Sequence, residues 1–341
     1  MAKLRGLYIL STGAFEMIYG PQQRAAIAEH VDEVAPPQTA KSIAENPSLL
    51  TDVDVIFSGW GAPLLNTAFL DAAPQLKAFF YGAGALGSVV TPAVWQRGIL
   101  VTSAIAANAV PVAEFTLATT LYSLKQGWRM SRRMTADNVG RNWNDHHLIP
   151  GAYGSTVGLI SMGFIARLLV KLLAPFDLKV IAYDPFLTAA HAREMGIELV
   201  SLDDVFRRSD VVSLHAPLLT ETRGMIEGRH LSLMKPDATF INTARGAIVR
   251  EAEMIDVLSQ RPDLTALLDV TFPEPPRADS PLYRLPNVVL TPHIAGSVGR
   301  ECQRMGQYMV DELHRFVAGQ PLKWSVTEAE AANSSHRPVN E

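Results

Sequence analysis

"TVGLISMGFIARLL", residues Thr156 to Leu169, decides how this chain folds, because a β-rich run leads into a tight turn and then into a helical pattern. Dinucleotide-binding proteins place the glycine-rich turn G-x-G-x-x-G at such a junction. Its three glycine positions fall on Ser161, Gly163 and Ala166. Gly163 keeps the position that lets backbone approach a pyrophosphate, and alanine is an accepted variant at the third position. At Ser161, a positive φ would cost roughly 1–2 kcal/mol. The turn is therefore predicted to be degraded but usable.

The residues that flank this turn favour NAD as the nucleotide. A helix that begins near Phe164 would direct the free N–H groups of Phe164 and Ile165 and its positive dipole end toward the phosphates. The next β-rich run, "KVIAYD", ends in Asp184, about 20 residues after the turn. Its carboxylate could accept hydrogen bonds from the adenosine ribose and would repel the 2′-phosphate of NADP. The alternative is that Asp184, followed by Pro185, only caps the end of a strand.

Short β-rich runs alternate with helical patterns along most of the chain. Nearly continuous apolar strands separated by helix-length segments indicate parallel sheets covered on both faces. We predict a Rossmann-type doubly wound parallel sheet in a cofactor domain, plus a smaller flavodoxin-like α/β domain. The expected ranges are 1–103 and 299–324 for the smaller domain, 104–298 for the NAD-binding domain and 325–341 for a flexible tail. A long helical pattern from Asn108, interpreted as its cap, to Arg133 joins the two domains.

Composition narrows the class of protein. The 341 residues carry a formal charge of −4, which provides no basic surface for nucleic acid. Cys302 is the only cysteine, which excludes an intramolecular disulfide framework. No segment approaches the ~18 consecutive apolar residues of a membrane span, so we expect a cytoplasmic protein. The adjacent His146 and His147 lack the spacing of metal ligands, and no metal site is expected.

Arg245, Glu274 and His293 each follow a predicted strand, at the end where open parallel sheets bind ligands. An arginine can grip a carboxylate with its planar fork, and a histidine can exchange a proton near neutral pH. A carboxylate beside the histidine would favour its imidazolium form. Alone, each residue could equally make an ion pair, mark a turn or lie in a polar loop. Because all three follow strands of one sheet that also carries a dinucleotide turn, we interpret them as a working set.

The chain resembles the D-isomer-specific 2-hydroxyacid dehydrogenases over residues 50–320. The resemblance rests on "NAVPVAEFTLA", "TVGLISMGFIA", "VVSLHAPLLTETRGMI", "FINTARGAIV", "LLDVTFPEPP" and "NVVLTPHIAG". It implies that Arg245 binds the substrate carboxylate and carbonyl, that His293 is the acid/base and that Glu274 is its partner. It also implies that Asp269 faces the nicotinamide carboxamide, and that the smaller domain, residues 1–103 and 299–324, is the substrate domain. By the same resemblance, the protein is a homodimer and the cleft between its domains closes over the substrate. The cofactor-binding set expected from motif and resemblance together is Gly163, Phe164, Ile165, Asp184, His215, Ala216, Pro217, Thr222, Thr243, Ala244, Asp269 and Gly296.

The expected reaction interconverts a 2-oxo acid and an (R)-2-hydroxy acid with NAD. Two loops, Ser58 to Leu64 and Phe80 to Gly87, lack lysine and arginine, which favours an apolar or aromatic substrate side chain over a phosphorylated one. The substrate-binding residues expected there are Trp60, Gly61, Tyr81, Gly82, Ala83 and Gly84. Formate dehydrogenases of this fold carry glutamine where this chain has Glu274, which argues against formate. The alternatives are an NAD-sensing, corepressor-like protein with little turnover and a phosphoglycerate dehydrogenase.

Overall fold

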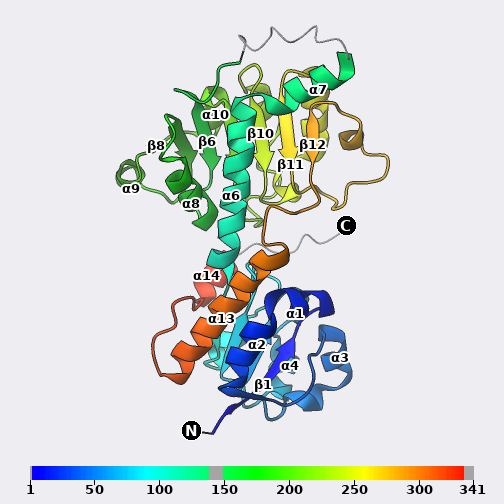
Figure 1. Cartoon of the computed structure of the whole chain (residues 1–341), viewed down its shortest axis with the longest axis vertical. Coiled ribbons are helices and arrows are strands. Elements are labelled where there is room, and N and C mark those ends of the chain that lie inside the picture. The colour runs from blue at the N-terminus through cyan, green and yellow to red at the C-terminus, as the bar shows by residue number, and fades with distance from the viewer. Residues whose placement is uncertain (1, 138–148, 334–341) are drawn as a thin grey trace. The chain divides into compact units, whose positions relative to one another are not determined.

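The computed structural model describes residues 2–137 and 149–333, which form two compact units (Figure 1). Of the described residues, unit 1 comprises 2–108 and 297–333, and unit 2 comprises 109–137 and 149–296. His146, His147 and residues 334–341 of the expected tail lie outside the described residues. No helix in the described part of the chain is both long enough and apolar enough to cross a membrane.

Unit 2 is built on a seven-stranded sheet in which every pair of neighbouring strands is parallel. The spatial order is β12-β11-β10-β9-β6-β7-β8, so the chain reverses its direction of winding between β6 and β9. This order confirms the doubly wound Rossmann fold, whose ligands bind at that switch point. The strands are β6 (Thr156–Ile160), β7 (Lys179–Tyr183), β8 (Glu198–Leu199), β9 (Val211–Leu214), β10 (Thr239–Asn242), β11 (Thr265–Leu268) and β12 (Val288–Leu290).

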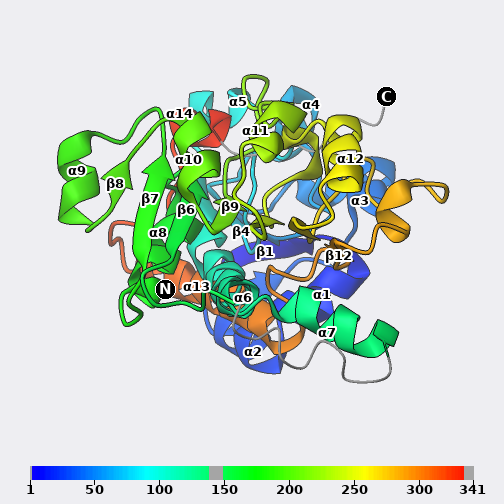
Figure 2. The same ribbon diagram turned by 90° about the horizontal axis from the view of Figure 1, so that it is seen from above.

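Helices cover both faces of this sheet, which explains why its strands read as continuous apolar runs. Figure 2 shows α10, α11 and α12 on the side opposite α6. Phe206 of α10 and Met254 of α12 pack on Val212 and Phe240, whereas Leu124 of α6 packs on Val211 and Ile241 of the other face. Besides α7 (Gly127–Asp137) and most of α6 (Ile105–Leu124), the helices of unit 2 are α8 (Phe164–Leu173), α9 (Ala189–Glu194), α10 (Leu202–Arg208), α11 (Gly228–Ser232) and α12 (Glu251–Gln260), with 3-10 turns η3 (Gly246–Ile248) and η4 (Pro281–Tyr283).

Unit 1 contains a five-stranded parallel sheet of order β2-β1-β3-β4-β5, which is the flavodoxin-like order. Helix α13 (Cys302–Val317), although it follows unit 2 in sequence, contributes Met305, Met309 and Leu313 to the core beneath this sheet. The other elements are β1 (Leu4–Ile9), α1 (Thr12–Ile18), α2 (Pro21–Ala28), β2 (Val31–Glu33), α3 (Ala40–Glu45), η1 (Pro47–Leu50), β3 (Val55–Ser58), α4 (Thr67–Ala72), β4 (Ala78–Tyr81), α5 (Ala93–Gln96), β5 (Leu100–Ser103), η5 (Gly299–Glu301) and α14 (Glu328–Ala332).

The helical pattern that follows β5 in the chain forms two helices, α6 (Ile105–Leu124) and α7 (Gly127–Asp137), separated at Gln126, where φ is 48°. Asn108 is not the cap that we expected, because α6 begins three residues earlier. The N–H of Ile105 donates instead to Ser103 Oγ at 3.1 Å. Asn108 Oδ1 accepts the N–H of Ser297 at 2.9 Å.

The expectation of a flexible tail from residue 325 is wrong for residues 325–332. The N–H of Val326 donates to Val101 O at 2.8 Å, and Trp95 Nε1 donates to Val326 O at 3.0 Å. Strand β5 lies at the edge of its sheet, so its backbone groups are open to such pairing. Helix α14 then begins with a capping box between Thr327 and Glu330.

Candidate active site

The turn between β6 and α8 holds Ser161 at a φ of 73°, in the left-handed region that favours glycine. Its N–H donates to Tyr183 O at 2.8 Å, which anchors the turn to β7. The dinucleotide-turn geometry is thus kept without the first glycine, at a strain of roughly 1–2 kcal/mol.

Gly163 lies at the N-terminus of α8 with φ −74° and ψ −165°, a conformation open to any residue. A Cβ atom built on it would meet nothing within 4 Å. Neither the backbone nor the surrounding side chains therefore require glycine here. The free N–H groups of the first helical turn, without a side-chain cap, face that open space. The site fits a diphosphate, which would occupy the room that a side chain would otherwise take.

Asp184 spans the turns after β6 and β7. Its Oδ2 accepts the N–H of Met162 at 2.7 Å, and its Oδ1 accepts the N–H groups of Phe186 and Leu187 at 2.8 and 2.9 Å. Asp184 therefore does cap backbone N–H groups at the end of its strand, as the alternative interpretation expected. A carboxylate has about four acceptor positions, so one remains on Oδ2 for a ribose hydroxyl.

The segment after β9 carries four of the expected cofactor residues. His215 and Ala216 are buried, and neither ring nitrogen of His215 has a hydrogen-bond partner among the described residues. Burial lowers the pKa of His215 to about 4, so its ring is neutral near pH 7. Thr222 has a local role: its hydroxyl donates to Pro217 O at 2.6 Å and accepts the N–H of Leu219 at 2.8 Å. It shapes the loop that contains Pro217.

Arg245 sits in a turn after β10 that Asn242 organises. Asn242 Oδ1 accepts the N–H of Ala244 at 3.0 Å, and its Nδ2 donates to Arg245 O at 3.2 Å. The next residue, Gly246, packs so tightly that a Cβ on it would lie 2.0 Å from the carbonyl carbon of Thr271. This close approach presses the arginine turn against the segment that leads to Glu274. Burial lowers the pKa of Arg245, and the negative charge of Glu274 opposes that effect.

Glu274 and His293 meet directly. Glu274 Oε1 lies 2.5 Å from His293 Nδ1, and their side chains are 36% and 47% exposed. Glu274 also acts electrostatically on Arg245, so its carboxylate connects the histidine with the arginine, and all three residues belong to unit 2. Their strands β10, β11 and β12 are neighbours in the sheet, so their carboxyl ends share one edge.

Asp269, which was expected to face the nicotinamide, holds the histidine loop. Its carboxylate accepts the Thr291 hydroxyl at 2.6 Å, the N–H of Ile294 at 2.8 Å and the N–H of Ala295 at 2.9 Å. Asp269 is 2% exposed, so these bonds form out of water. About one acceptor position of the carboxylate remains for a ligand. Gly296 ends the same loop and is the last residue of unit 2 that the structure describes.

The expected substrate residues of unit 1 divide into loop and core. Tyr81 is 4% exposed and stacks on Phe79, with ring centroids 6.0 Å apart. Ala83 is also fully buried. The expectation that the Tyr81 ring contacts a substrate therefore needs correction, because this last residue of β4 points into the apolar core. Trp60 is only partly buried. Gly61, Gly82 and Gly84 lie in the two strand-end loops and have only backbone to offer.

The sequence did not lead us to predict the roles of Asn242 and Gly246, which shape the turn that carries Arg245. Both are visible in the segment "FINTARG", where an amide and a glycine flank the arginine closely. Nothing in the local pattern, however, indicates that the glycine meets the backbone of Thr271, 25 residues further on. Thr291, whose hydroxyl bonds to Asp269, was missed for the same reason.

The sheet is doubly wound, its first turn has room for a pyrophosphate, and arginine, glutamate and histidine follow neighbouring strands. These features together define a dinucleotide-dependent class of enzyme. Residues 117–295 match the family described as D-isomer specific 2-hydroxyacid dehydrogenase, NAD binding domain. The chain belongs to this family. A small 2-hydroxy or 2-oxo acid substrate fits that membership.

Individual relatives show the range of the family. The chain is 34% identical over 259 residues to a D-3-phosphoglycerate dehydrogenase of Mycobacterium tuberculosis, covering 76% of this chain and 48% of the relative. It is 31% identical to a glyoxylate reductase of Thermofilum pendens, covering 75% and 76%. A phosphoglycerate oxidoreductase structure from Rhizobium etli has the same fold, with a TM-score of 0.81, 22% identity and coverage of 96% and 99%. The chain spans about half the length of the phosphoglycerate dehydrogenases that it matches.

Proposed function

We propose that this protein is an NAD-dependent dehydrogenase that interconverts a 2-oxo acid and an (R)-2-hydroxy acid. The observation that carries the proposal is the 2.5 Å contact between His293 Nδ1 and Glu274 Oε1, a carboxylate whose charge also acts on the guanidinium of Arg245. A histidine oriented by a carboxylate is a general acid/base, and a desolvated arginine is a strong ligand for a substrate carboxylate. The two functions are those that reduction of a 2-oxo acid requires.

In this mechanism the bound nicotinamide supplies or accepts the hydride. Arg245 grips the substrate carboxylate and polarises the carbonyl, which fixes the face that is presented. His293 delivers a proton to the carbonyl oxygen during reduction and removes it during oxidation. Because Glu274 occupies Nδ1, the exchangeable proton resides on Nε2, and the carboxylate stabilises the positive charge of the imidazolium.

The cofactor contacts follow from the strand ends. The N–H groups of Phe164 and Ile165, with the space at Gly163, would hold the pyrophosphate. The remaining acceptor position of Asp184 would take a ribose hydroxyl, as suits NAD. The segments around Ala216, Pro217, Ala244 and Gly296 would line the nicotinamide half, with Thr222 supporting the first of them.

For the substrate side chain, we propose an uncharged group that contacts Trp60 and the backbone of Gly61, Gly82 and Gly84. The two loops lack lysine and arginine, so a phosphate would find no cation there. The named activity of the mycobacterial relative favours 3-phosphohydroxypyruvate as the second candidate. We also propose a homodimer in the cytoplasm, which sedimentation and fractionation would test.

A substrate panel tests the proposal. Purified protein and NADH are offered glyoxylate, hydroxypyruvate, pyruvate, aryl-pyruvates and 3-phosphohydroxypyruvate, and NADH oxidation is followed. Turnover of uncharged 2-oxo acids, reduced about 10²–10⁴-fold by His293→Ala with NADH binding unchanged, is expected. Turnover of the phosphorylated acid alone would overturn the substrate class. Tight NADH binding with no turnover of any acid would instead identify a sensor.

A further inference from the structure

The segment that carries Glu274 has few backbone donors with which to hold its place. It runs from Val270 to Pro276 with the sequence VTFPEPP, and its three prolines lack an N–H group. It lies between the end of β11 at Leu268 and the start of η4 at Pro281. Glu274 Oε1 nevertheless lies 2.5 Å from His293 Nδ1. The geometry of that pair therefore depends on the contacts that hold this segment.

One of these contacts comes from the helix that follows Arg245 in the chain. Glu251 Oε2 accepts the N–H of Phe272 at 3.1 Å, two residues before Glu274. Glu251 is the first residue of α12, and the chain reaches it from Arg245 through η3. The guanidinium carbon of Arg223 lies 5.5 Å from the centroid of the Phe272 ring. The Glu251 side chain thus ties the segment of one reacting residue to that of another.

The carboxylate of Glu251 is poorly suited to stabilise the fold by its charge. It is partly buried, and this burial raises its pKa, while the hydrogen bond from Phe272 opposes the effect. No cation among the described residues offsets the burial. A desolvated carboxylate whose partner is a neutral peptide group recovers only part of the free energy lost on leaving water. Its contribution is instead a fixed distance between two segments that carry reacting groups.

We propose that Glu251 is a positioning residue, which holds the segment of Glu274 so that this carboxylate meets His293 Nδ1. The inference rests on the proposed function and adds to it a residue that acts through Glu274. With the Phe272 N–H released, the Glu274 carboxylate would move away from the ring. The neutral imidazole would then lose the acceptor that keeps its proton on Nδ1. Reach from α12 to the Phe272 N–H, and not negative charge, is the property that matters.

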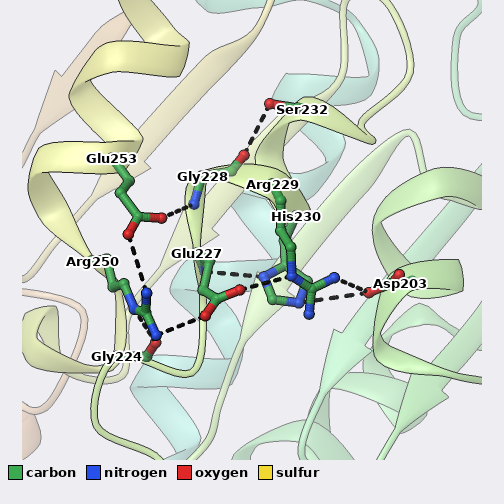
Figure 3. A network of polar contacts seen from close by, with 9 residues as sticks. All are labelled: Asp203, Gly224, Glu227, Gly228, Arg229, His230, Ser232, Arg250 and Glu253. Atoms are coloured by element: carbon green, nitrogen blue, oxygen red, sulfur yellow. Dashed lines mark hydrogen bonds and ion pairs between the residues drawn. The ribbon is translucent and has the colours of Figure 1, made fainter.

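Glu253 provides a matched contrast in the same helical turn. Its Oε2 accepts the N–H of Gly228 at 2.8 Å, and its Oε1 lies 3.2 Å from Arg250. Figure 3 shows both contacts, within a network that Arg250 continues to Glu227. This second glutamate joins α12 to α11. Each of the two glutamates anchors one backbone N–H, but that of Glu253 belongs to a helix, whereas that of Glu251 belongs to the segment of a reacting residue.

The test compares Glu251→Asp, Glu251→Gln and Glu253→Asp in the full chain. Aspartate keeps the charge but is one methylene too short, whereas the glutamine oxygen can still accept the Phe272 N–H. NMR of the ring nitrogens, with His293→Gln to identify the signals, measures which nitrogen of His293 carries the proton of the neutral ring. Urea midpoints, NADH titration and steady-state kinetics with the 2-oxo acid that is turned over fastest complete the comparison.

In the wild type, the neutral ring of His293 is expected to carry its proton on Nδ1. Glu251→Asp should shift that proton toward Nε2 and lower kcat about 10–100-fold, because a displaced group loses that much in a reaction that depends on orientation. NADH affinity should stay unchanged. Glu251→Gln should keep the wild-type tautomer and most of kcat. Glu253→Asp should lower the urea midpoint at least as much as Glu251→Asp and leave tautomer and kcat unchanged.

A wild-type tautomer in Glu251→Asp would overturn the proposal. So would equal changes in Glu251→Asp and Glu253→Asp, since any weakening of α12 would produce them. A loss in Glu251→Gln without one in Glu251→Asp would also overturn it, because charge would then be the property that matters. The proposed function fails in a different way: a wild-type protein that reduces no 2-oxo acid would refute the dehydrogenase, while the tautomer contrast would still support the positioning role. A wild-type ring with its proton on Nε2 would overturn both, since both depend on the contact with Glu274.

Discussion

Asp269 holds the backbone of His293: its carbonyl oxygen accepts the His293 N–H at 2.9 Å, while its carboxylate binds three donors of the following loop. His293 itself has a φ of 55°, a left-handed conformation that non-glycine residues adopt only when the surroundings impose it. The carboxylate that ends β11 thus places the imidazole that follows β12. Asp269 therefore positions His293, the proton-transfer group of the proposed mechanism.

Asp269→Asn should therefore loosen the histidine loop. An amide replaces an acceptor by a donor, so at least one N–H of Ile294 or Ala295 loses its partner. We expect a loss of about 1–3 kcal/mol in unfolding free energy. We also expect a lower kcat with little change in NADH affinity, measured by urea titration, steady-state kinetics and NADH titration. Asp263→Asn, in an ion pair with Arg261 at the surface, is the control. Wild-type kcat in Asp269→Asn would contradict the positioning role.

Gly163→Ala distinguishes an effect on nucleotide binding from an effect on the stability of the fold. Because its φ is −74° and a Cβ would meet nothing within 4 Å, the apo protein should keep its stability. The methyl group would intrude where the pyrophosphate approaches, and we expect NADH affinity to fall at least about tenfold, or 1.4 kcal/mol. Isothermal titration and thermal unfolding would measure the two effects.

Gly246→Ala is the matched control, because tight packing, and not room for a ligand, requires glycine at this position. Its Cβ would lie 2.0 Å from the carbonyl carbon of Thr271, so the variant should lose stability even without nucleotide. A Gly163→Ala protein that is destabilised as much as Gly246→Ala would show that the first glycine also serves the fold.

Ser161→Gly tests the strain in the turn. Relief of the left-handed conformation should yield roughly 1–2 kcal/mol. The greater freedom of glycine in the unfolded chain removes about 0.5–1 kcal/mol of that gain. We expect a net stabilisation of up to about 1.5 kcal/mol by urea titration, with NADH affinity equal or higher. Lower stability would indicate that the Ser161 side chain has a role of its own in the turn.

Because the imidazole of His215 is buried, we expect the stability of the folded protein to be sensitive to acid. Its pKa falls from 6.5 to about 4 on folding, so between these values the unfolded chain binds the proton more readily than the folded one. The contribution is intact above pH ~6.5 and is lost as the pH falls toward 4, by about 3 kcal/mol in total. Urea midpoints of wild type and His215→Leu should therefore diverge below pH 6.5, with the variant less sensitive to acid. Parallel pH profiles would place the imidazole in contact with solvent.

The fold and the placement of Arg245, Glu274 and His293 at strand ends could be predicted because both depend on local patterns. Apolar runs of strand length indicate buried parallel strands, and parallel strands align their carboxyl ends. Arg245, Glu274 and His293 each follow such a run, so their proximity follows from topology. The NAD-binding turn was recognisable for the same reason: strand, turn and helix are contiguous in the chain.

Only the tertiary structure shows which hydrogen-bonding positions and which surface of each side chain remain free for a ligand. Asp184 was assigned to NAD from its place in the pattern and Asp269 from the family resemblance, yet protein donors fill most of their acceptor positions, and all of these except the N–H groups of Phe186 and Leu187 come from other segments. Tyr81 was assigned to the substrate, but its ring packs in the core. The unpaired atoms of His215 and Thr243 also emerge only when the partners of each group can be counted. Hydrogen-bond partners and packing neighbours come from residues distant in sequence, so composition and periodicity carry the architecture, and only the folded chain shows which polar groups remain to bind a ligand.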